Sequence, residues 1–316
     1  MKLKIAVVHG GTSTESAAST ASAGYIARGL IAKGHDARLV EFDGAITATL
    51  REMQPQLVFV AVQGKNHGDG YLQSICEDLG LPYTGTDAVA AALINDKNRS
   101  KELCRSAGLR TPEQILLSRQ DFAALSPNRV AERIEAILAY PLVAKAVGQG
   151  GGYGLAYLST RQDLARLGGR FAFDEAIIVE RFVHGIFVTS AVLETEQGLT
   201  VLPSLSLRQE SCELDPIEAY NQCYDIVEAD LAPEMQAEVE SFSKEIFHLF
   251  GATTYARIDL MLEATTRHLY FIEINAVPGL KPSSFFPQAA LRFGLELPDL
   301  LEQIVASAIR GGNRRA

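Results

Sequence analysis

The chain has 316 residues, of which 47% are hydrophobic and 21% are charged, and its formal net charge is −9. This length exceeds one ordinary hydrophobic core and predicts two or three lobes. The negative net charge argues against a nucleic-acid-binding surface, and no apolar run approaches the roughly 20 residues that span a bilayer. The N-terminus lacks the features of a signal peptide. We therefore expect a cytoplasmic protein without nucleic-acid or membrane partners.

Strand and helix patterns alternate along residues 1–94, which we take as an N-terminal domain. Residues 3–8 form a continuous apolar run, typical of a buried parallel strand, and a helix is expected from about Thr12 to Lys33. Alternation with short loops predicts a doubly wound parallel sheet. The other elements expected here are strands at residues 37–42 and 57–62 and helices at residues 46–53 and 74–79.

The pattern changes near Asn95, so we expect a central α+β domain over residues 95–183 and a C-terminal domain over residues 184–316. The central domain is predicted to contain helices at residues 96–107 and 121–138 and strands at residues 141–147 and 176–179. The C-terminal domain is predicted to contain a strand at residues 185–193, a long polar loop at 207–230, a helix at 233–250, two strands that resemble a hairpin at 254–262 and 268–274, and helices at 287–293 and 297–309.

Polar side chains on the two hairpin strands carry the strongest chemical signal. Arg257 and Asp259 are two residues apart on one strand, and Glu273 and Asn275 are two apart on the next, so each pair shares a face. Antiparallel pairing would bring three oxygen donors together, and hard oxygen ligands on rigid strands suit Mg²⁺. The alternative is a solvated polar face of an ordinary hairpin.

Three further features could contact a polyanion or an amino acid. The glycine-rich run at residues 148–154 follows a strand that carries Lys145, and such a loop exposes backbone N–H groups to phosphates. Lys97 begins a predicted helix, and Glu15 lies in the first turn after the first strand, where open α/β sheets bind ligands. Each feature also has a structural explanation: a flexible hairpin tip, a surface lysine, or a favourable charge at a helix N-terminus.

Taken together, the motifs resemble the D-alanine–D-alanine ligases of the ATP-grasp superfamily over almost the whole chain. The motifs that carry the resemblance are Gly-Gly-Thr-Ser-Thr-Glu at residues 10–15, Gly-Asp-Gly-Tyr-Leu-Gln at 68–73, Leu-Pro-Tyr-Thr-Gly at 81–85, Asp-Lys at 96–97, Arg-Ile-Asp at 257–259 and Glu-Ile-Asn-Ala-Val-Pro-Gly at 273–279. The resemblance implies a fold of three lobes, namely the doubly wound parallel N-terminal sheet, a central α+β lid lobe and a C-terminal antiparallel-sheet lobe. ATP would lie between the last two.

The resemblance also implies an activity: ATP- and Mg²⁺-dependent joining of amino acids through an acyl phosphate, with Mn²⁺ as a possible replacement. The protein would act as a homodimer on amino-acid substrates. Asp259, Glu273 and Asn275 would hold the metal. The residues implied to contact ATP are Lys97, Lys145, Gly150, Gly151, Gly152, Glu180, Phe182 and Val183. The residues implied to act on the amino acids are Glu15, which would bind an ammonium group, and Arg257, Gly279 and Ser284, which would hold a carboxylate and the oxyanion.

Several positions depart from the family pattern. Gly151-Gly152 replaces a Ser-Ser pair, Gln63 replaces a histidine, and Phe187 replaces the acid that takes the ribose hydroxyls. Gly68 stands where a glutamate is expected, and the Lys-Tyr pair of the long loop is missing, with Glu-Ala-Tyr-Asn at residues 218–221 standing nearest. Metal and phosphate positions are retained while substrate positions differ, so we expect substrates other than two D-alanines.

Three other functions stay open at this point. The first is an ATP-grasp ligase of specialised metabolism that joins different amino acids or closes a ring within one of them. The second is a nucleotide-binding regulator without catalysis, which the intact Asp259, Glu273 and Asn275 set argues against. The third is a dehydrogenase with a doubly wound first lobe, which the absence of Gly-x-Gly-x-x-Gly after the first strand argues against.

Overall fold

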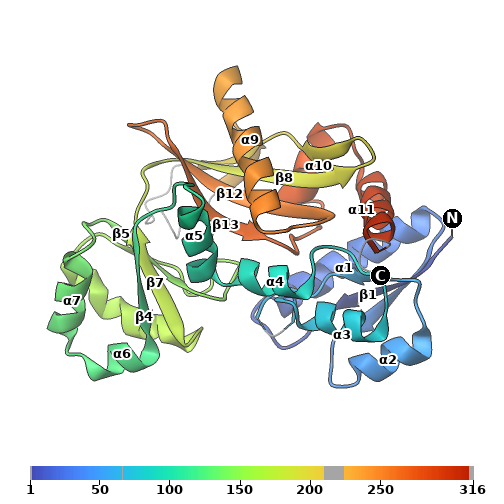
Figure 1. The fold of residues 1–316 in the computed structure, drawn as a ribbon, viewed down its shortest axis with the longest axis horizontal. Coiled ribbons are helices and arrows are strands. Elements are labelled where there is room, and N and C mark those ends of the chain that lie inside the picture. The colour runs from blue at the N-terminus through green and yellow to red at the C-terminus, as the bar shows by residue number, and fades with distance from the viewer. Residues whose placement is uncertain (1, 66, 210–223, 313–316) are drawn as a thin grey trace.

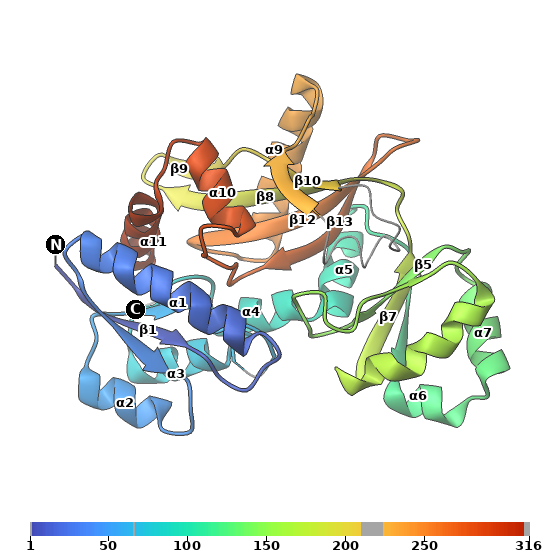
Figure 2. The same cartoon turned by 180° about the vertical axis from the view of Figure 1, so that it is seen from behind.

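The computed structural model describes residues 2–65, 67–209 and 224–312, which form three β-sheets flanked by helices (Figures 1 and 2). The N-terminal sheet has the strand order β2-β1-β3, and both pairings are parallel. Its strands are β1 (Lys4–His9), β2 (Asp36–Glu41) and β3 (Leu57–Val60), and its helices are α1 (Ser16–Ala32), α2 (Ile46–Met53), α3 (Tyr71–Leu79) and α4 (Ala88–Asn95).

Helices cover both faces of this sheet, which confirms the doubly wound prediction. Ile5 and Val7 of β1 are buried with residues of α1, whereas Ala6 and Val8 are buried on the other face with residues of α2 and α3. The strand is therefore apolar at every position, as expected for a parallel strand that is covered on both sides. The first helix begins at Ser16, four residues later than predicted.

The central sheet is antiparallel and has the strand order β4-β7-β5-β6. The prediction of a single helix at residues 121–138 is wrong, because two helices occupy this segment. Ser118 and Ser126 each accept a backbone hydrogen bond at a helix start, and Pro127 occupies the first turn of the second helix, where proline is tolerated. The elements are β4 (Gln114–Ser118), α6 (Arg119–Ala124), α7 (Pro127–Glu135), β5 (Leu142–Ala146), β6 (Ala156–Leu158), the 3₁₀ helix η1 (Arg161–Ala172) and β7 (Ala176–Arg181).

The C-terminal sheet has the order β11-β10-β8-β12-β13, with β9 paired to β8, and all its pairings are antiparallel. Its strands are β8 (Gly185–Thr195), β9 (Gly198–Val201), β10 (Leu205–Gln209), β11 (Tyr224–Glu228), β12 (Tyr255–Glu263) and β13 (Leu269–Asn275), and the helices of this part are α9 (Pro233–Leu249), α10 (Phe285–Arg292) and α11 (Leu297–Gly312). The hairpin prediction is confirmed. The prediction of one loop over residues 207–230 is wrong at both ends, where β10 and β11 pair; residues 210–223 lie outside the described part.

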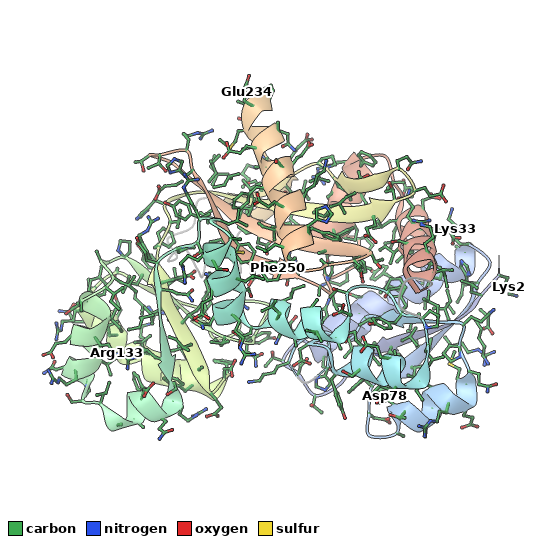
Figure 3. The ribbon with its side chains drawn as sticks, in the orientation of Figure 1. Lys2, Lys33, Asp78, Arg133, Glu234 and Phe250 are labelled. Atoms are coloured by element: carbon green, nitrogen blue, oxygen red, sulfur yellow. The ribbon has the colours of Figure 1, made fainter. Side chains whose placement is uncertain are left out.

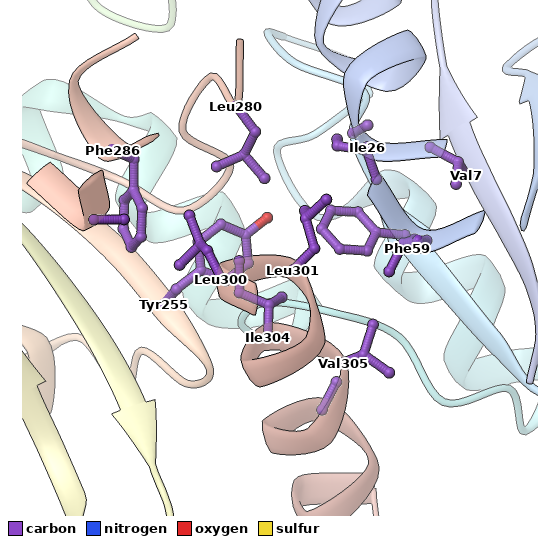
Figure 4. Packing of buried hydrophobic residues seen from close by; sticks show 14 of the residues in the cluster. Val7, Ile26, Phe59, Tyr255, Leu280, Phe286, Leu300, Leu301, Ile304 and Val305 are labelled. Carbon is purple, nitrogen blue, oxygen red and sulfur yellow. The ribbon is translucent and has the colours of Figure 1, made fainter. Parts of the chain in front are cut away.

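The two ends of the chain share one hydrophobic core. Leu300, Leu301 and Ile304 of α11 are buried against Ile26 of α1 and Phe59 of β3 (Figure 4). At the rim of this core, Lys33 at the end of α1 lies beside α11 and pairs with Asp299 (Figure 3). The first and last parts of the chain therefore pack against each other at this contact.

The central sheet has its own core, which is separate from the core shared by the chain ends. Helix α5 (Lys97–Ser106) is buried with the C-terminal sheet instead, through Cys104, together with Ile94 and Leu109. The domain limits at residues 94 and 183 stay a prediction. No helix among the described residues is both long and apolar enough to cross a membrane.

Replacing Leu301 with Ala should destabilise the chain by about 2–5 kcal/mol, because a fully buried leucine would leave a cavity. Leu301 also contacts the helix α1 closely: a Cβ built on Gly29 would lie 2.5 Å from Leu301 Cδ1. The free energy of unfolding in urea tests this expectation. Leu291→Ala is the matched control, since Leu291 is 50% exposed and its loss should change stability by about 0.5 kcal/mol or less. Equal effects of the two substitutions would contradict the shared core.

Candidate active site

A cleft of about 1040 Å³ lies where the three parts of the chain meet. Every residue that the sequence nominated for a site lines it. From the N-terminal part and α5 come Glu15 and Lys97; from the central part come Lys145, Gly150, Gly151, Gly152, Glu180, Phe182 and Val183; and from the C-terminal part come Arg257, Asp259, Glu273, Asn275, Gly279 and Ser284. The structure thus brings together residues that are up to 269 positions apart, from Glu15 to Ser284 (284 − 15).

Asp259 and Glu273 face each other across the hairpin. The two residues are direct cross-strand partners of β12 and β13, and Arg257 is the partner of Asn275. Arg257 donates to both oxygens of Asp259, at 2.9 and 2.7 Å, and Asn275 Nδ2 lies 3.5 Å from Asp259 Oδ2. Residues opposite one another in an antiparallel pair share a face. Asp259, Glu273 and Asn275 therefore lie close together on one face of the hairpin, and Asn275 presents its amide nitrogen to Asp259.

Cations surround these carboxyl groups. Lys97 Nζ lies 3.3 Å from Glu273 Oε2, and Arg257 Nη2 lies 3.9 Å from Glu273 Oε1. Burial alone would raise the pKa of Glu273, but the charges of Lys97, Arg257 and Lys145 lower it to about 2. Burial raises the pKa of Asp259 despite the neighbouring Arg257. With these cations beside it, Glu273 is ionised at neutral pH.

The glycine-rich loop at residues 148–154 bends over the cleft and contacts the N-terminal part. Gly150 N donates to Glu15 Oε1 at 3.0 Å, and Lys97 Nζ donates to the carbonyl oxygen of Gln149 at 2.6 Å. Gly151 and Gly152 have φ values of 61° and 76°, a region that favours glycine. The path of the backbone therefore favours glycine at both positions.

A second contact holds the start of this loop. Asp174 accepts hydrogen bonds from Gly148 N at 2.7 Å and from Lys65 Nζ at 2.6 Å. Lys65 belongs to the N-terminal part, so the loop is attached to that part on two sides.

Burial raises the pKa of the Glu15 carboxyl group. Lys97 and the Gly150 N–H offset only part of the cost of burying its charge.

The strand β7 and the residues after it form the other wall of the cleft. Glu180 is 2% exposed and pairs through its two oxygens with Lys101 and Lys145. Phe182 packs edge-on against Tyr157, with 5.2 Å between ring centroids. The carboxylate of Glu180 is thus engaged by two lysines, and Phe182 lines the same wall of the cleft.

The opposite end of the cleft contains Arg257, Gly279 and Ser284. A Cβ on Gly279 would lie 3.1 Å from Ser284 Oγ, so the hydroxyl is directly beside the glycine backbone. Arg257 lies over the Phe285 ring, 5.4 Å from its centroid. Gln63 Nε2 donates to the carbonyl oxygen of Val277 at 3.0 Å and so ties the N-terminal part to this turn.

Two residues at the site were missed from the sequence. Lys101 is fully buried behind Glu180, although its position four residues after Lys97 on one helix face was a usable signal. Thr189 Oγ1 donates to Asp259 Oδ1 at 2.6 Å from the neighbouring strand β8, and nothing in the local sequence indicates that pairing. The segment at residues 218–221, nominated in place of a Lys-Tyr pair, lies outside the described residues.

The comparisons with known proteins agree with this geometry. A family model described as the D-ala D-ala ligase C-terminus matches residues 103–306. A D-alanine–D-alanine ligase from Chromohalobacter salexigens is 34% identical over 306 residues, which cover 96% of this chain and 93% of the relative. The chain belongs to the D-alanine–D-alanine ligase family. It is therefore an ADP-forming ATP-grasp ligase that makes C–N bonds between amino acids, and neither a dehydrogenase nor a non-catalytic regulator.

Two further comparisons cover nearly the whole chain. A D-alanine–D-alanine ligase from Carboxydothermus hydrogenoformans is 29% identical over 98% of this chain and 99% of the relative. The crystal structure of a D-alanine–D-alanine ligase from Bacillus anthracis complexed with ATP superposes with a TM-score of 0.84 at 22% identity, covering 99% of this chain and 100% of that chain. This structural likeness shows that the ATP-grasp fold of three lobes is shared.

Replacing Glu180 with Gln should destabilise the fold by about 3–5 kcal/mol, because it leaves the buried ammonium of Lys101 without a counter-charge. Glu175→Gln is the control at the end of the same sheet. Glu175 pairs with Arg119 at 2.8 Å, but its side chain is 76% exposed, and its loss should cost less than about 1 kcal/mol. Chemical denaturation of both variants measures the difference. A Glu180→Gln variant as stable as the control would show that the buried pair is not coupled to folding.

Proposed function

We propose that this ligase activates the carboxylate of one amino acid with ATP and joins it to the amine of a second, with Mg²⁺ bound by Asp259, Glu273 and Asn275. The observation that carries the proposal is the position of these oxygen donors. They lie in the wall of one cleft that the glycine-rich loop, Lys97, Arg257 and Gly279 also line. Phosphate chemistry and amine attack can therefore take place at adjoining places.

The donor set fits a magnesium ion. Two carboxyl groups and one side-chain amide on adjacent strands offer hard oxygen ligands, and Mg²⁺ is usually completed by substrate phosphates and water. Mn²⁺ prefers similar donors and is proposed as a substitute. When bound, such an ion neutralises charge on the transferring phosphoryl group.

The other groups of the cleft have roles that follow from their charge. Lys97 and Lys145 would bind phosphate oxygens, and the N–H groups of Gly150, Gly151 and Gly152 would bind the same phosphates as the loop closes. The adenine ring would lie against the wall formed by residues 180–183. The carboxylate of the first amino acid attacks the γ-phosphate, and ADP and an acyl phosphate form.

The second half of the reaction would take place beside the first, among Arg257, Gly279 and Ser284. The amine of the second amino acid attacks the acyl phosphate, and the guanidinium of Arg257 with the Gly279 N–H would stabilise the tetrahedral oxyanion. One preorganised donor of this kind contributes about 3–4 kcal/mol to the transition state. Ser284, beside Gly279, would bind the second carboxylate, and Glu15 would bind the ammonium group of the first amino acid. The loop that contacts Glu15 would exclude water from the acyl phosphate.

Three narrower expectations are proposed without support from the cleft itself. The division into domains at residues 1–94, 95–183 and 184–316 would be tested by limited proteolysis. Assembly as a homodimer would be tested by light scattering on the purified protein. A cytoplasmic location would be tested by fractionation of the source cells.

Replacing Glu273 with Ala should lower ADP formation at least about 100-fold, because the carboxylate that stays ionised is lost from the metal site. The melting temperature should stay within a few degrees, since a quarter of the Glu273 side chain is exposed. Coupled ADP assays and thermal melts test both statements. Glu234→Ala is the control, because Glu234 lies exposed at the start of α9 (Figure 3) and should leave activity unchanged. Normal ADP formation by the Glu273 variant would refute the metal assignment.

The relatives are named for D-alanine, but this chain should use D-alanine poorly. Gly151 provides no hydroxyl in the cleft. The side-chain amide nitrogen of Gln63 already donates a hydrogen bond to the carbonyl oxygen of Val277. Each polar group of the substrate left unpaired costs about 1–3 kcal/mol, so two losses lower kcat/KM by orders of magnitude. Phosphate release with a panel of D- and L-amino acids, singly and in pairs, measures the preference. A D-alanine pair that outperforms the whole panel would overturn this expectation.

A further inference from the structure

Helix α5 places two lysines in one row between the sheets. Lys97 and Lys101 are four residues apart, so their side chains project from the same face of the helix. Figures 1 and 2 both place α5 between the C-terminal sheet and the central sheet. Lys97 reaches the carboxylate of Glu273 on the first of these sheets, and Lys101 reaches Glu180 on the second.

The environments of the two lysines differ. The Lys97 side chain is 12% exposed and lines the cleft, whereas the Lys101 side chain is fully buried. Burial lowers the pKa of Lys101 to about 8 despite the carboxylate beside it. A buried ammonium is retained at such a cost only where a partner is held tightly against it. That partner is Glu180, which itself lines the cleft.

Glu180 divides its two oxygens between two cations. One oxygen pairs with Lys101 and the other with Lys145, whose side chain is 13% exposed and reaches the cleft. Burial alone would raise the pKa of Glu180, but the two ammonium groups lower it, so the carboxylate is ionised. Three charges thus form a row from the buried helix face to the wall of the cleft, with a net charge of about +1.

We propose that Lys101 is a positioning residue for the nucleotide site. It balances the charge of Glu180, so that Glu180 can orient Lys145 while the positive charge of Lys145 stays available to the phosphates of ATP. The inference rests on the proposed function, because it assigns Lys145 to the phosphates. With Lys101 present, one negative charge is shared by two positive ones, and the Lys145 ammonium keeps a surplus for a polyanion. Lys101 itself lies behind Glu180 and acts only through it.

Removal of Lys101 alone has a predictable electrostatic result. Glu180 would then have Lys145 as its single remaining cation in the row, and the pair would be neutral. Lys145, which already contacts this carboxylate, would be held by it more strongly and would be less available to the phosphates. If Glu180 is neutralised at the same time, Lys145 becomes free again. The second substitution should therefore restore the affinity for the nucleotide. A purely structural role would alter the KM of the amino acids as well, so an unchanged amino-acid KM separates positioning from structure.

The experiment compares Lys101→Met with the double variant Lys101→Met/Glu180→Gln. The dissociation constant of a non-hydrolysable ATP analogue with Mg²⁺ is measured by calorimetry without amino acids. The single variant should bind about tenfold more weakly, the size expected for one lost charge-assisted contact, and the double variant should return to within about threefold of the unaltered chain. The KM of ATP should follow the same order, with the KM of the amino acids unchanged. Lys33→Met, which removes a paired lysine far from the cleft, is the control for the substitution.

The outcomes separate the possibilities. If the double variant binds the analogue no better than Lys101→Met, or if Lys101→Met binds like the unaltered chain, the positioning role is wrong. If Lys101→Met fails to fold, the double variant still decides. The ammonium group that it leaves without a carboxylate in this row is that of Lys145, which reaches the cleft, and this variant should bind within about threefold. Failure of the unaltered chain to bind the analogue would instead overturn the proposed nucleotide site.

Discussion

The register of the β12–β13 hairpin is the constraint on which the rest of the site depends. It places Asp259 directly opposite Glu273 in the wall of the cleft, and a shift of one residue would turn one of the two carboxyl groups to the other face of the sheet. Alternate residues such as Ile258 and Ile274 are buried in the core below, so a shifted register would also expose them. The same burial that stabilises the sheet therefore fixes the position of the acids.

Two carboxyl groups brought so close require cations, and the surrounding elements provide them. Arg257 comes from the same strand, whereas Lys97 comes from α5 and is linked through Gln149 to the glycine-rich loop. Lys97 and Arg257 therefore each contact the acidic pair and also line the cleft. A ligand that withdraws Lys97 from Glu273 leaves the carboxylate free for a metal ion, so binding of phosphates and of the metal are expected to favour each other.

Much of this arrangement could be predicted from the sequence, and the errors have identifiable causes. The hairpin and its acids were predictable because alternation reports which residues share a face. The expectation of a single helix over residues 121–138 is wrong because Ser126 and Pro127 start a second helix. Strands β10 and β11 are hard to recognise because each is only five residues long, although apolar and polar residues largely alternate in them. Lys101 could not be identified as a site residue because its burial arises only when two sheets pack on α5.

The glycine-rich loop shows why substrate positions cannot be considered one at a time. A Cβ on Gly150 would lie 2.4 Å from Glu15 Oε1, so a side chain there would displace either the loop or the carboxylate. The loop proposed to hold phosphates is thus in van der Waals contact with the group proposed to bind an ammonium. Burial raises the pKa of Glu15, the Gly150 N–H of the loop offsets part of that effect, and an arriving ammonium would offset more by providing a counter-charge. Closure of the loop and binding of the first amino acid are therefore expected to stabilise each other. The acyl phosphate would then form only after the loop has enclosed the first amino acid, whose carboxylate accepts the phosphoryl group.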